Sequence, residues 1–486
     1  MPREQIPVTS SVITWARKRA GFSVEEAAEK FSKIAAWEAG EAFPTYPQIE
    51  RLADTFKLPI AVFFFPEPPD LPPISESFRT LPAEEFEQIP RRVKFLLRKA
   101  QAQQLNLSEL CQGQNPAERL ITRDLEFTVN VQLEEMAREV RDYIGISLEE
   151  QYAWGTNDDA FKNWRLALSD VGVFVFKDAF RVPEYSGFCL YDEVFPIIYV
   201  NNSAAKTRQI FTLFHELAHL LFHTSGIDTI GDKYIPALPA LARRIEVLCN
   251  RFAAQFLVPE AAFRDAIAGL DRSEATAELL AARFHVSREF IYRKFLDQGK
   301  ISQEAYFEAA DRWAKQRVSG GSGGDPYWTK IAYLGREYIQ LALSQYHQNR
   351  IDQRQLAEYL NSKPRHVATL EEYFSRGGHM TYVFDNSPLS TLFRNYYRRR
   401  FPTLWQNFDD LVDNGDIVST REVRHEIEDG PDESLRDWAV QNSELFTVPN
   451  AEEGAFVAQI YAVRHFQQNI ERQKMLKGGR IADPSS

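Results

Sequence analysis

Apolar residues recur at helical spacing along most of this 486-residue chain, and short apolar runs of strand type occur in two places only. The pattern predicts a multidomain, mainly α-helical protein with a small α+β core and a C-terminal α/β segment. Helices are expected in residues 8–66, 84–165, 211–223, 245–300 and 327–374. Strands are expected at Val171–Phe176, Gly187–Leu190 and Phe195–Val200, and near the C-terminus at Tyr382–Asp385 and Ile417–Ser419.

Clusters of proline, glycine and serine divide the chain. A proline-rich stretch from Pro66 to Pro73 favours a stiff extended path, and Ser319–Gly324 is typical of a flexible linker. Met380 follows Gly377-Gly378-His379 and resembles the first residue of a separate protein, so a fusion of two proteins, natural or built, is one interpretation. The expected domains are residues 1–70, 71–317, a linker at 318–326, 327–378, and 380–486.

Composition narrows the cellular setting. Hydrophobic residues make up 44% and charged residues 26%, and neither a membrane-spanning run nor a signal peptide is evident, so we expect a cytoplasmic protein. The cysteines at 111, 189 and 249 are odd in number and far apart, which favours a reducing compartment. The net charge of −11 repels phosphate, so any nucleic-acid binding needs a local basic patch.

The stretch Phe211–His223 carries the clearest chemistry. His215 and His219 are four residues apart, so their imidazoles leave the same face of a helix and can share one Zn²⁺. Glu216 lies beside the first of them and can act as a general base toward water. The alternative is a core helix that happens to carry surface histidines.

A second helical stretch, Ile245–Pro259, offers the third ligand. Glu246 can reach the metal, and Asn250, one turn later, can hydrogen-bond a group behind it. Cys249 is interpreted as a small buried residue, and His223 as a residue that helps to close its helix. Two histidines, one glutamate and an open fourth position are typical of a catalytic zinc site rather than a structural one.

These two motifs, H-E-L-A-H-L-L-F-H and E-x-x-C-N-R-F-A-A-Q-F-L-V-P, resemble the ImmA/IrrE zinc metallopeptidases, over roughly residues 1–376. The resemblance implies a zincin core with zinc ligands at His215, His219 and Glu246 and with Glu216 as the base. It implies that Pro196–Asn201 forms an edge strand that holds an extended substrate. Members of the family cleave or displace a repressor, or serve as antitoxins.

Residues 8–66 resemble the XRE-type helix-turn-helix domain that commonly precedes ImmA/IrrE domains. Ser23 and Glu26 form an expected capping box, and a basic run comprises Arg17, Lys18 and Arg19. Between Ala28 and Trp37 the chain is about one helical turn short of that pattern, which argues against docking in a major groove. We expect weak, salt-dependent operator binding at best; the alternative is a module that binds protein or forms a homodimer.

Two further helical regions follow the metal motif. Residues 280–294 also resemble a helix-turn-helix, but packing behind a zincin core is the preferred interpretation, with His285 as a packed histidine. Residues 327–378 resemble the C-terminal extension of antitoxin members of the family, which implies a contact with the cognate toxin.

Residues 380–486 resemble a PIN-like ribonuclease toxin, in which acids at strand ends hold Mg²⁺ or Mn²⁺. The expected acids are Asp385, Glu422, Glu426 and Asp483. Because the sequence ends three residues after Asp483, the segment is predicted to be incomplete and inactive as a ribonuclease. The alternative is an α/β interaction domain.

Together these features predict a toxin–antitoxin protein. In this interpretation a regulator with a zinc metallopeptidase domain neutralises a PIN-like toxin, which is either its own C-terminal segment or a partner. The alternative is an active zinc protease that cleaves a repressor or regulator, with a non-catalytic C-terminal interaction domain. No membrane partner is expected.

Overall fold

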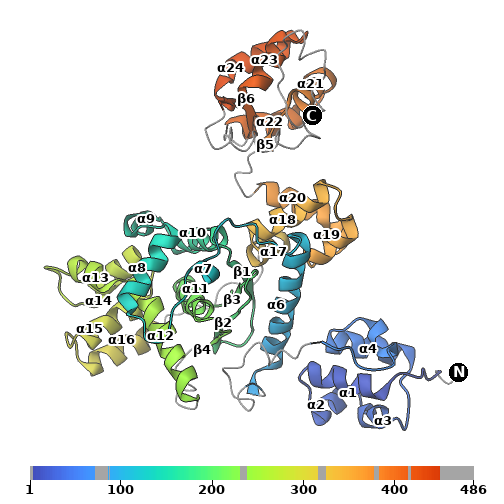
Figure 1. The fold of residues 1–486 in the computed structure, drawn as a ribbon, viewed down its shortest axis with the longest axis vertical. Coiled ribbons are helices and arrows are strands. Elements are labelled where there is room, and N and C mark those ends of the chain that lie inside the picture. The colour runs from blue at the N-terminus through green and yellow to red at the C-terminus, as the bar shows by residue number, and fades with distance from the viewer. Residues whose placement is uncertain are drawn as a thin grey trace. The chain divides into compact units, whose positions relative to one another are not determined.

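The structure is a computed structural model that describes residues 4–71, 86, 88–229, 238–315, 325–376, 382–413 and 417–448. It is 63% helical with a small mixed sheet, as the apolar pattern predicts (Figure 1). The chain divides into two compact units, Met1–Ala368 and Thr369–Ser486. Within the described ranges, no helix is both long enough and apolar enough to cross a membrane.

The N-terminal module is a cluster of short helices with its own core. It comprises α1 (Ser10–Arg19), α2 (Val24–Lys30), α3 (Ile34–Glu38), α4 (Tyr46–Phe56) and η1 (Ile60–Phe64). Ser23 and Glu26 form the predicted capping box, with side-chain to backbone distances of 3.1 and 2.9 Å. Trp37, Phe56 and Phe63 are fully or almost fully buried in its centre. The third helix has only five residues, in line with the short spacing expected there.

A four-stranded sheet lies at the centre of the first unit, with the order β1-β3-β2-β4. The strands are β1 (Phe174–Asp178), β2 (Tyr185–Leu190), β3 (Ile197–Asn201) and β4 (Ile227–Thr229). β1 and β3 run parallel, whereas β2 is antiparallel to both β3 and β4. Since β3 lies between β1 and β2, the expectation that residues 196–201 form a substrate-holding edge strand is wrong. The edge strand beside α11 (Lys206–Leu221), the helix that carries His215 and His219, is β4, which was not predicted from the sequence.

The start of β1 also differs from the expectation. Val171 is not a strand residue, because it caps the C-terminus of α10 (Asn157–Asp170), and Gly172 follows with φ +87°. A β-carbon on Gly172 would lie 2.5 Å from Leu120, so the turn needs glycine for both its conformation and its packing. The apolar run therefore contains a helix end, a turn and only then a strand.

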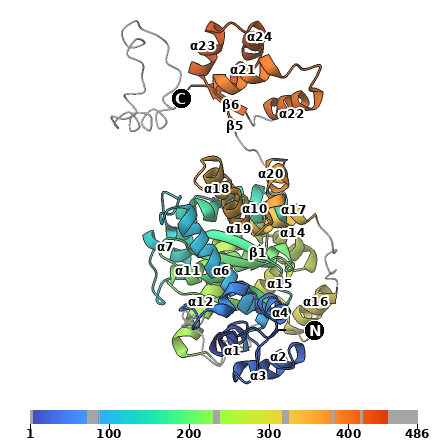
Figure 2. The same ribbon diagram turned by 90° about the vertical axis from the view of Figure 1, so that its right-hand side faces the viewer.

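Helices cover both faces of this sheet (Figures 1 and 2). One face packs on α10 and on α11 (Lys206–Leu221), through Val175, Ile198 and Val200. The other face is aromatic: Tyr199 stacks on Phe188 at 5.1 Å and on Phe176 at 5.6 Å. This aromatic face contacts α6 (Arg91–Leu110), α17 (Pro326–Leu334) and α18 (Arg336–His347).

The helices α17 and α18, which begin the predicted extension at residues 327–378, are thus part of the central fold. Arg165 of α10 is buried and donates to the carbonyl oxygens of Ala332 (2.8 Å) and Tyr333 (3.3 Å) at the end of α17, and also to that of Val175. The ring of Tyr338 is buried against Phe176, and its hydroxyl bonds the carbonyl oxygen of Tyr359. The extension continues through α19 (Gln353–Tyr359) and η4 (Pro364–His366), and α20 (Val367–Arg376) spans the boundary between the two units.

The remaining helices of the first unit pack around α11. α12 (Ala240–Leu257) lies against both α11 and α8 (Leu133–Ile144). Phe256 of α12 stacks on Phe214 of α11 at 4.1 Å between ring centroids. The other elements are α7 (Ile121–Asp124), α9 (Leu148–Ala153), α13 (Glu260–Ala266), α14 (Glu274–Phe284), α15 (Arg288–Asp297) and α16 (Gln303–Lys315). Phe284, Ile291 and Phe295 of α14 and α15 are buried in the shared core, so the packing that the structural interpretation of residues 280–294 expects is present.

The second unit contains short parallel strands among helices, as the α/β expectation requires (Figure 2). Its sheet has the order β5 (Tyr382–Val383), β6 (Ile417–Thr420), β7 (Phe446–Thr447). Trp405, Phe408 and Trp438 form the aromatic part of its core. Its helices are α21 (Asn386–Asn395), α22 (Pro402–Asp413), α23 (Arg421–Asp429), α24 (Glu433–Gln441) and η5 (Ser443–Leu445). The expected Gly/Ser linker and Asp483 lie outside the described residues.

Candidate metal centre

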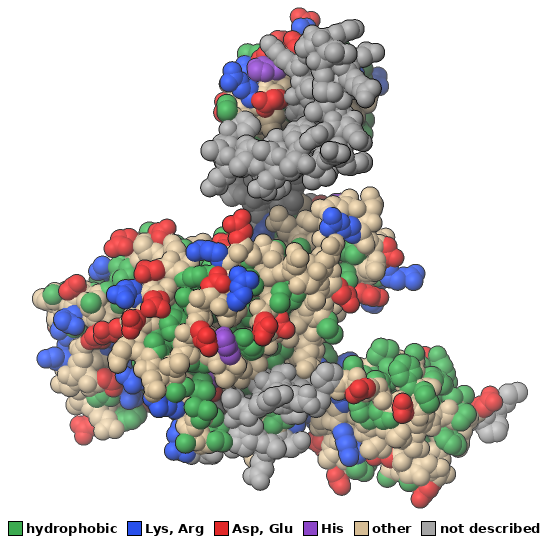
Figure 3. Space-filling view, viewed as in Figure 1, with side chains coloured by type: hydrophobic (Ala, Val, Ile, Leu, Met, Phe, Trp, Pro, Cys, Tyr) green, Lys and Arg blue, Asp and Glu red, His purple; other side chains and the backbone are tan. Residues whose placement is uncertain are grey.

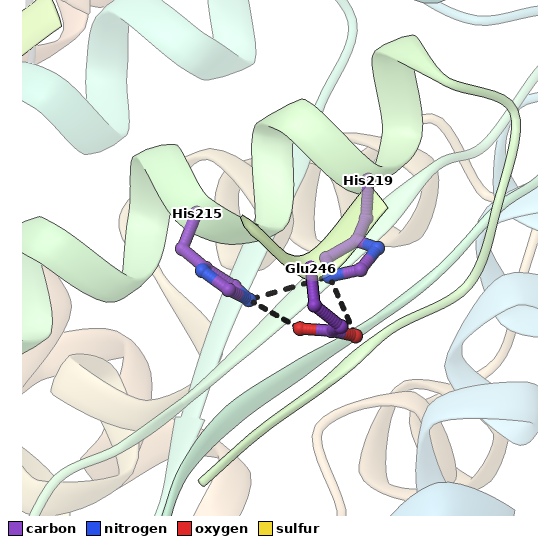
Figure 4. Close-up of side chains that lie close together, drawn as sticks. All are labelled: His215, His219 and Glu246. Atoms are coloured by element: carbon purple, nitrogen blue, oxygen red, sulfur yellow. Dashed lines mark hydrogen bonds and ion pairs between the residues drawn. The ribbon is translucent and has the colours of Figure 1, made fainter. Parts of the chain in front are cut away.

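Three side chains from two helices converge as the sequence predicts. α11 supplies His215 and His219, and α12 supplies Glu246 (Figure 4). The two Nε2 atoms are 3.3 Å apart, and the carboxylate oxygens of Glu246 lie 3.5 Å from Nε2 of His215 and 3.3 Å from that of His219. Among the described residues, this is the one group of three His, Cys, Asp or Glu side chains close enough to hold a metal ion.

Hydrogen bonds fix the orientation of both imidazoles. Nδ1 of His215 lies 3.2 Å from Oδ1 of Asn250, an acceptor, so Nδ1 carries the proton. Nδ1 of His219 lies 3.3 Å from the hydroxyl oxygen of Thr224, whose own proton goes to the carbonyl oxygen of His219 at 3.1 Å. Both Nε2 atoms therefore direct a bare lone pair at the same point. Asn250 has the supporting position expected of it, whereas Thr224 was not predicted.

This donor set fits zinc. Ligands at ~2.0–2.1 Å from Zn²⁺ at tetrahedral angles lie roughly 3.3–3.4 Å from one another. The three observed separations, 3.3, 3.3 and 3.5 Å, match that spacing. Two imidazole lone pairs and a carboxylate so close together repel one another unless a cation lies between them. The site therefore has the chemistry and dimensions of a three-ligand zinc centre.

Glu216 is completely buried beside the three ligands, and no N–H or O–H group of the protein donates a hydrogen bond to its carboxylate; its side-chain partner is the weak thiol donor of Cys189. Burial raises its pKa to about 8, while the neighbouring His219 opposes the shift. A divalent cation at the three ligands would lower this pKa again. A buried carboxylate that receives no strong hydrogen bond from the protein is suited to accept a proton from a water molecule, which is the role the sequence predicts.

The ligands themselves have perturbed titration. Burial lowers the pKa of His215, but the carboxylates of Asp228 and Glu246 outweigh that effect, and the net shift is upward. Burial raises the pKa of Glu246, but the two histidines reverse the sign and hold it well below its usual value. The three groups are therefore coupled charges in a nearly closed pocket, with His215 1%, His219 2% and Glu246 6% exposed.

Asp228 ties the edge strand to the zinc helix, and the sequence analysis missed it. Its carboxylate accepts two hydrogen bonds from Arg208, at 2.7 and 2.8 Å, and one from Thr212 at 2.9 Å. Arg208 and Thr212 precede His215 on α11, whereas Asp228 belongs to β4. This network fixes the spacing between β4 and the metal ligands. The sequence pattern could not identify Asp228, because a three-residue strand is too short to predict and the contact of Asp228 with Arg208 and Thr212 exists only in the folded structure.

Gly226 lets β4 approach the metal ligands. A β-carbon at this position would lie 2.4 Å from Cδ2 and 2.7 Å from Nε2 of His219. Its N–H donates to the sulfur of Cys189 on β2 at 3.2 Å. Gly187 plays a similar part on β2, where a β-carbon would lie 2.4 Å from Thr212. The strands thus reach the zinc helix at backbone distance, which only glycine permits.

Three other predicted residues have the positions expected of them. His223 follows the end of α11 with φ +53°, and its Nε2 lies 3.0 Å from the carbonyl oxygen of Thr122, so it helps to close the helix. Cys249 is fully buried in the core. His285 is 3% exposed and contacts Asn157 at 2.9 Å, so it is a packed histidine.

The basic run of the N-terminal module does not form a surface patch as a whole. Arg17 is only 6% exposed: it pairs with Glu38 at 2.6 and 3.1 Å and donates to the carbonyl oxygen of Phe22. Its assignment to DNA binding is therefore wrong, because its guanidinium ties α1 to α3 and to the turn before α2. Lys18 and Arg19 remain the predicted DNA-binding residues. Arg19 is partly buried, and its guanidinium lies over the ring of Trp15 at 5.5 Å.

The described acids of the second unit do not gather into a comparable centre. Asp385 precedes α21, and Glu422 and Glu426 lie one turn apart on α23, all partly exposed. Asn386 donates to Glu426 at 3.4 Å, which brings the start of α21 to α23. These three acids do not form a metal-binding group within the described residues.

Comparison with known families assigns two segments. Residues 168–296 match the family model of the IrrE N-terminal-like domain, a zinc-dependent peptidase family, and this range contains β1–β4, α11 and α12. Residues 382–484 match a domain of unknown function, DUF4411. No curated protein matches the chain. The first unit therefore contains a zinc-metallopeptidase-like module of the ImmA/IrrE type, in which His215, His219 and Glu246 could hold a metal ion.

Proposed function

We propose that this is a toxin–antitoxin protein in which the zinc-metallopeptidase-like unit neutralises a PIN-like ribonuclease toxin. The toxin is the DUF4411 segment of the same chain or a partner with such a domain. One observation carries the proposal: a complete His-His-Glu centre is joined, in one chain, to a separately folded α/β unit. Neutralisation needs tight binding of the toxin and does not by itself need turnover.

The alternative function is proteolysis of a repressor or regulator, with the second unit as an interaction domain. The specific observation in its favour is Glu216, which is buried beside the ligands and receives no hydrogen bond from an N–H or O–H group of the protein. Zinc, when bound there, supplies a Lewis acid that polarises a peptide carbonyl and acidifies water. Glu216 would then take the proton of the attacking water and pass it to the leaving amine.

The geometry also suggests how a peptide would be held. β4 is an edge strand, and Gly226 brings its start against the His219 ring. An extended peptide that added to this edge would pass beside the three ligands, held by main-chain hydrogen bonds. The Asp228 network with Arg208 and Thr212 would keep that edge at a fixed distance from the centre.

Co-expression separates the two functions. A full-length PIN-like toxin with a DUF4411-type domain, expressed alone in a bacterial host, should arrest growth, and residues 1–378 of this chain supplied from a second plasmid should relieve the arrest. Glu216→Gln in residues 1–378 keeps the shape of the side chain but cannot take a proton from water. If this variant relieves the arrest as fully as the unmodified sequence, neutralisation by binding is supported.

The opposite results are equally clear. Failure of residues 1–378 to relieve the arrest caused by the full-length toxin would contradict the neutralising role. Relief that depends on Glu216, together with cleavage products whose formation slows by about 10²–10⁴-fold in Glu216→Gln, would favour the protease. The zinc content of each purified protein should be measured, so that Glu216→Gln and the unmodified sequence are compared with the same amount of bound zinc.

A further inference from the structure

A groove of about 1110 Å³ runs between α12 and the start of α8, on a face of α12 next to the one that carries Glu246. The helix presents Glu246 and Asn250 to the metal centre, whereas Arg244, Leu248 and Arg251 turn toward the groove. Residues 129–135 and Arg138 form the opposite wall. The groove therefore shares a helix with the zinc site without containing its ligands.

The groove is strongly basic in an acidic protein. Four arginines line it, against two acids, in a chain with a net charge of −11. All four are exposed. Arg244 donates to the side chain of Asn130 at 2.6 Å, and Arg138, Arg244 and Arg251 form no ion pair with a described carboxylate. The arginines are Arg138, Arg243, Arg244 and Arg251, and the acids are Glu134 and Glu135.

Apolar side chains also line the groove, beside the polar side chains of Asn130 and Gln132. Val247 is 42% exposed on α12, and Leu248 beside it is partly exposed. Val131 and Leu133 face them from the start of α8. Figure 3 shows Lys and Arg side chains in blue along the end of α12 where the helix begins, next to apolar side chains in green. Isolated apolar residues on a surface are ordinary, but here they lie between arginines within one concavity.

We propose that this groove binds an acidic, amphipathic peptide segment of a protein partner, with carboxylates on the arginines and apolar side chains between them. Arginine forms bidentate bonds with carboxylates, and the apolar residues add the desolvated area that gives specificity. Nucleic acid fits the surface less well, because Glu134 and Glu135 lie in the groove and the molecule as a whole repels phosphate.

This inference deepens the proposed function and rests on it for the role of the partner, which the zinc unit would then mask or cleave. Binding itself requires no zinc chemistry. Failure of the groove to bind would leave the zinc site and its neutralising or proteolytic function untouched, so the two proposals can fail separately.

The probe is a fluorescein-labelled 16-residue peptide in which Glu and Leu alternate in pairs, titrated with the full chain and followed by anisotropy. The groove variant is Arg244→Glu with Arg251→Glu. Its matched control is Arg264→Glu with Arg354→Glu, two exposed arginines outside the groove, which changes the net charge by the same amount. We expect the groove variant to bind at least about tenfold more weakly and the control within about twofold of the unmodified chain.

A milder pair guards against misfolding. Arg244→Gln with Arg251→Gln should weaken binding by a few-fold, and Val247→Ser should do the same without changing charge. Each variant should keep its thermal transition and zinc content, since Glu246 on the same helix reports whether α12 is in place. Equal weakening in the groove and control variants would overturn the proposal. So would a 16-base-pair DNA duplex that displaced the peptide at lower concentration than unlabelled peptide does.

Discussion

The zinc centre of the first unit and the acidic set of the second differ in how their geometry is fixed. His215, His219 and Glu246 come from two long, adjacent helices and are buried together, with every supporting hydrogen bond in place. Asp385, Glu422 and Glu426 come from a strand end and a nine-residue helix and are partly exposed. The first set has one arrangement, whereas the second has no fixed common point among the described residues.

The difference follows from the periodicity of helices. Residues i and i+4 on a helix share a face whatever the rest of the fold does, so H-E-x-x-H specifies a geometry by itself. Acids placed after separate strands meet only if strand order, register and helix angles all cooperate. Sequence spacing is thus direct evidence for the zinc site and only indirect evidence for an acidic one.

The largest effect is expected when one of the three predicted metal ligands is removed. His215→Ala should reduce zinc from about one per chain to nearly none, because two ligands cannot close a tetrahedral site. His223→Ala is the matched control, since His223 follows the same helix but contacts Thr122 instead of the centre. Elemental analysis of both purified variants decides the matter. Full zinc in His215→Ala, or equal loss in His223→Ala, would show that the centre lies elsewhere.

A second test probes the close approach of β4. Gly226→Ala would place a methyl group 2.4 Å from the His219 ring, so the ring or the strand must shift. We expect zinc affinity to fall by about 10–100-fold, as it does when support for a ligand is lost. Gly155→Ala is the control, because a β-carbon there has no neighbour closer than 3.8 Å. Competition with a zinc chelator measures both; unchanged affinity in Gly226→Ala would contradict this packing.

The sequence predicted the zinc ligands, Glu216 and Asn250 because all of them lie on two helices with clear periodicity. It did not reveal Thr224, Gly226 or Asp228, whose importance depends on how β4 meets α11. It placed residues 196–201 at an edge because an apolar strand shows no sign of how many neighbours it has. It assigned Arg17 to a DNA surface because a basic run does not show which member pairs with Glu38.

A third test concerns a buried charge of the central unit. Lys177 of β1 is 4% exposed, its Nζ lies 4.3 Å from the Phe161 ring centroid, and burial lowers its pKa to about 6. Between that value and the unfolded value near 10.5, the unfolded chain binds more protons, so stability rises with pH by up to about 1.4 kcal/mol per unit. Lys177→Met should therefore be more stable than the unmodified chain at pH 7, and this advantage should shrink toward pH 9.

Urea unfolding at pH 7, 8 and 9 gives the free energy of unfolding of Lys177→Met and of the unmodified chain at each pH. Lys162→Met on α10 is the control, because Lys162 is exposed and should show no such pH-dependent advantage. A gap between Lys177→Met and the unmodified chain that stayed constant from pH 7 to pH 9 would mean that Lys177 is not held in the neutral form. Burial of Lys177 would then cost no more free energy than exposure of Lys162 does.

The smallest effect is expected in the second unit. Glu422 and Glu426 are partly exposed on α23 and do not form a metal-binding group with Asp385. Glu422→Gln and Glu426→Gln should change the free energy of unfolding by no more than about 0.5 kcal/mol, because neither removes a buried charge or a core contact. Neither should alter a Mn²⁺ titration of the full chain.

Glu428→Gln, at the end of the same helix and paired with Arg424 at 2.9 Å, is the control. If Glu422→Gln or Glu426→Gln abolished a tight Mn²⁺ site that Glu428→Gln left intact, the acids would converge after all. Strand-end spacing would then be as good a guide to a metal site as the helical motif.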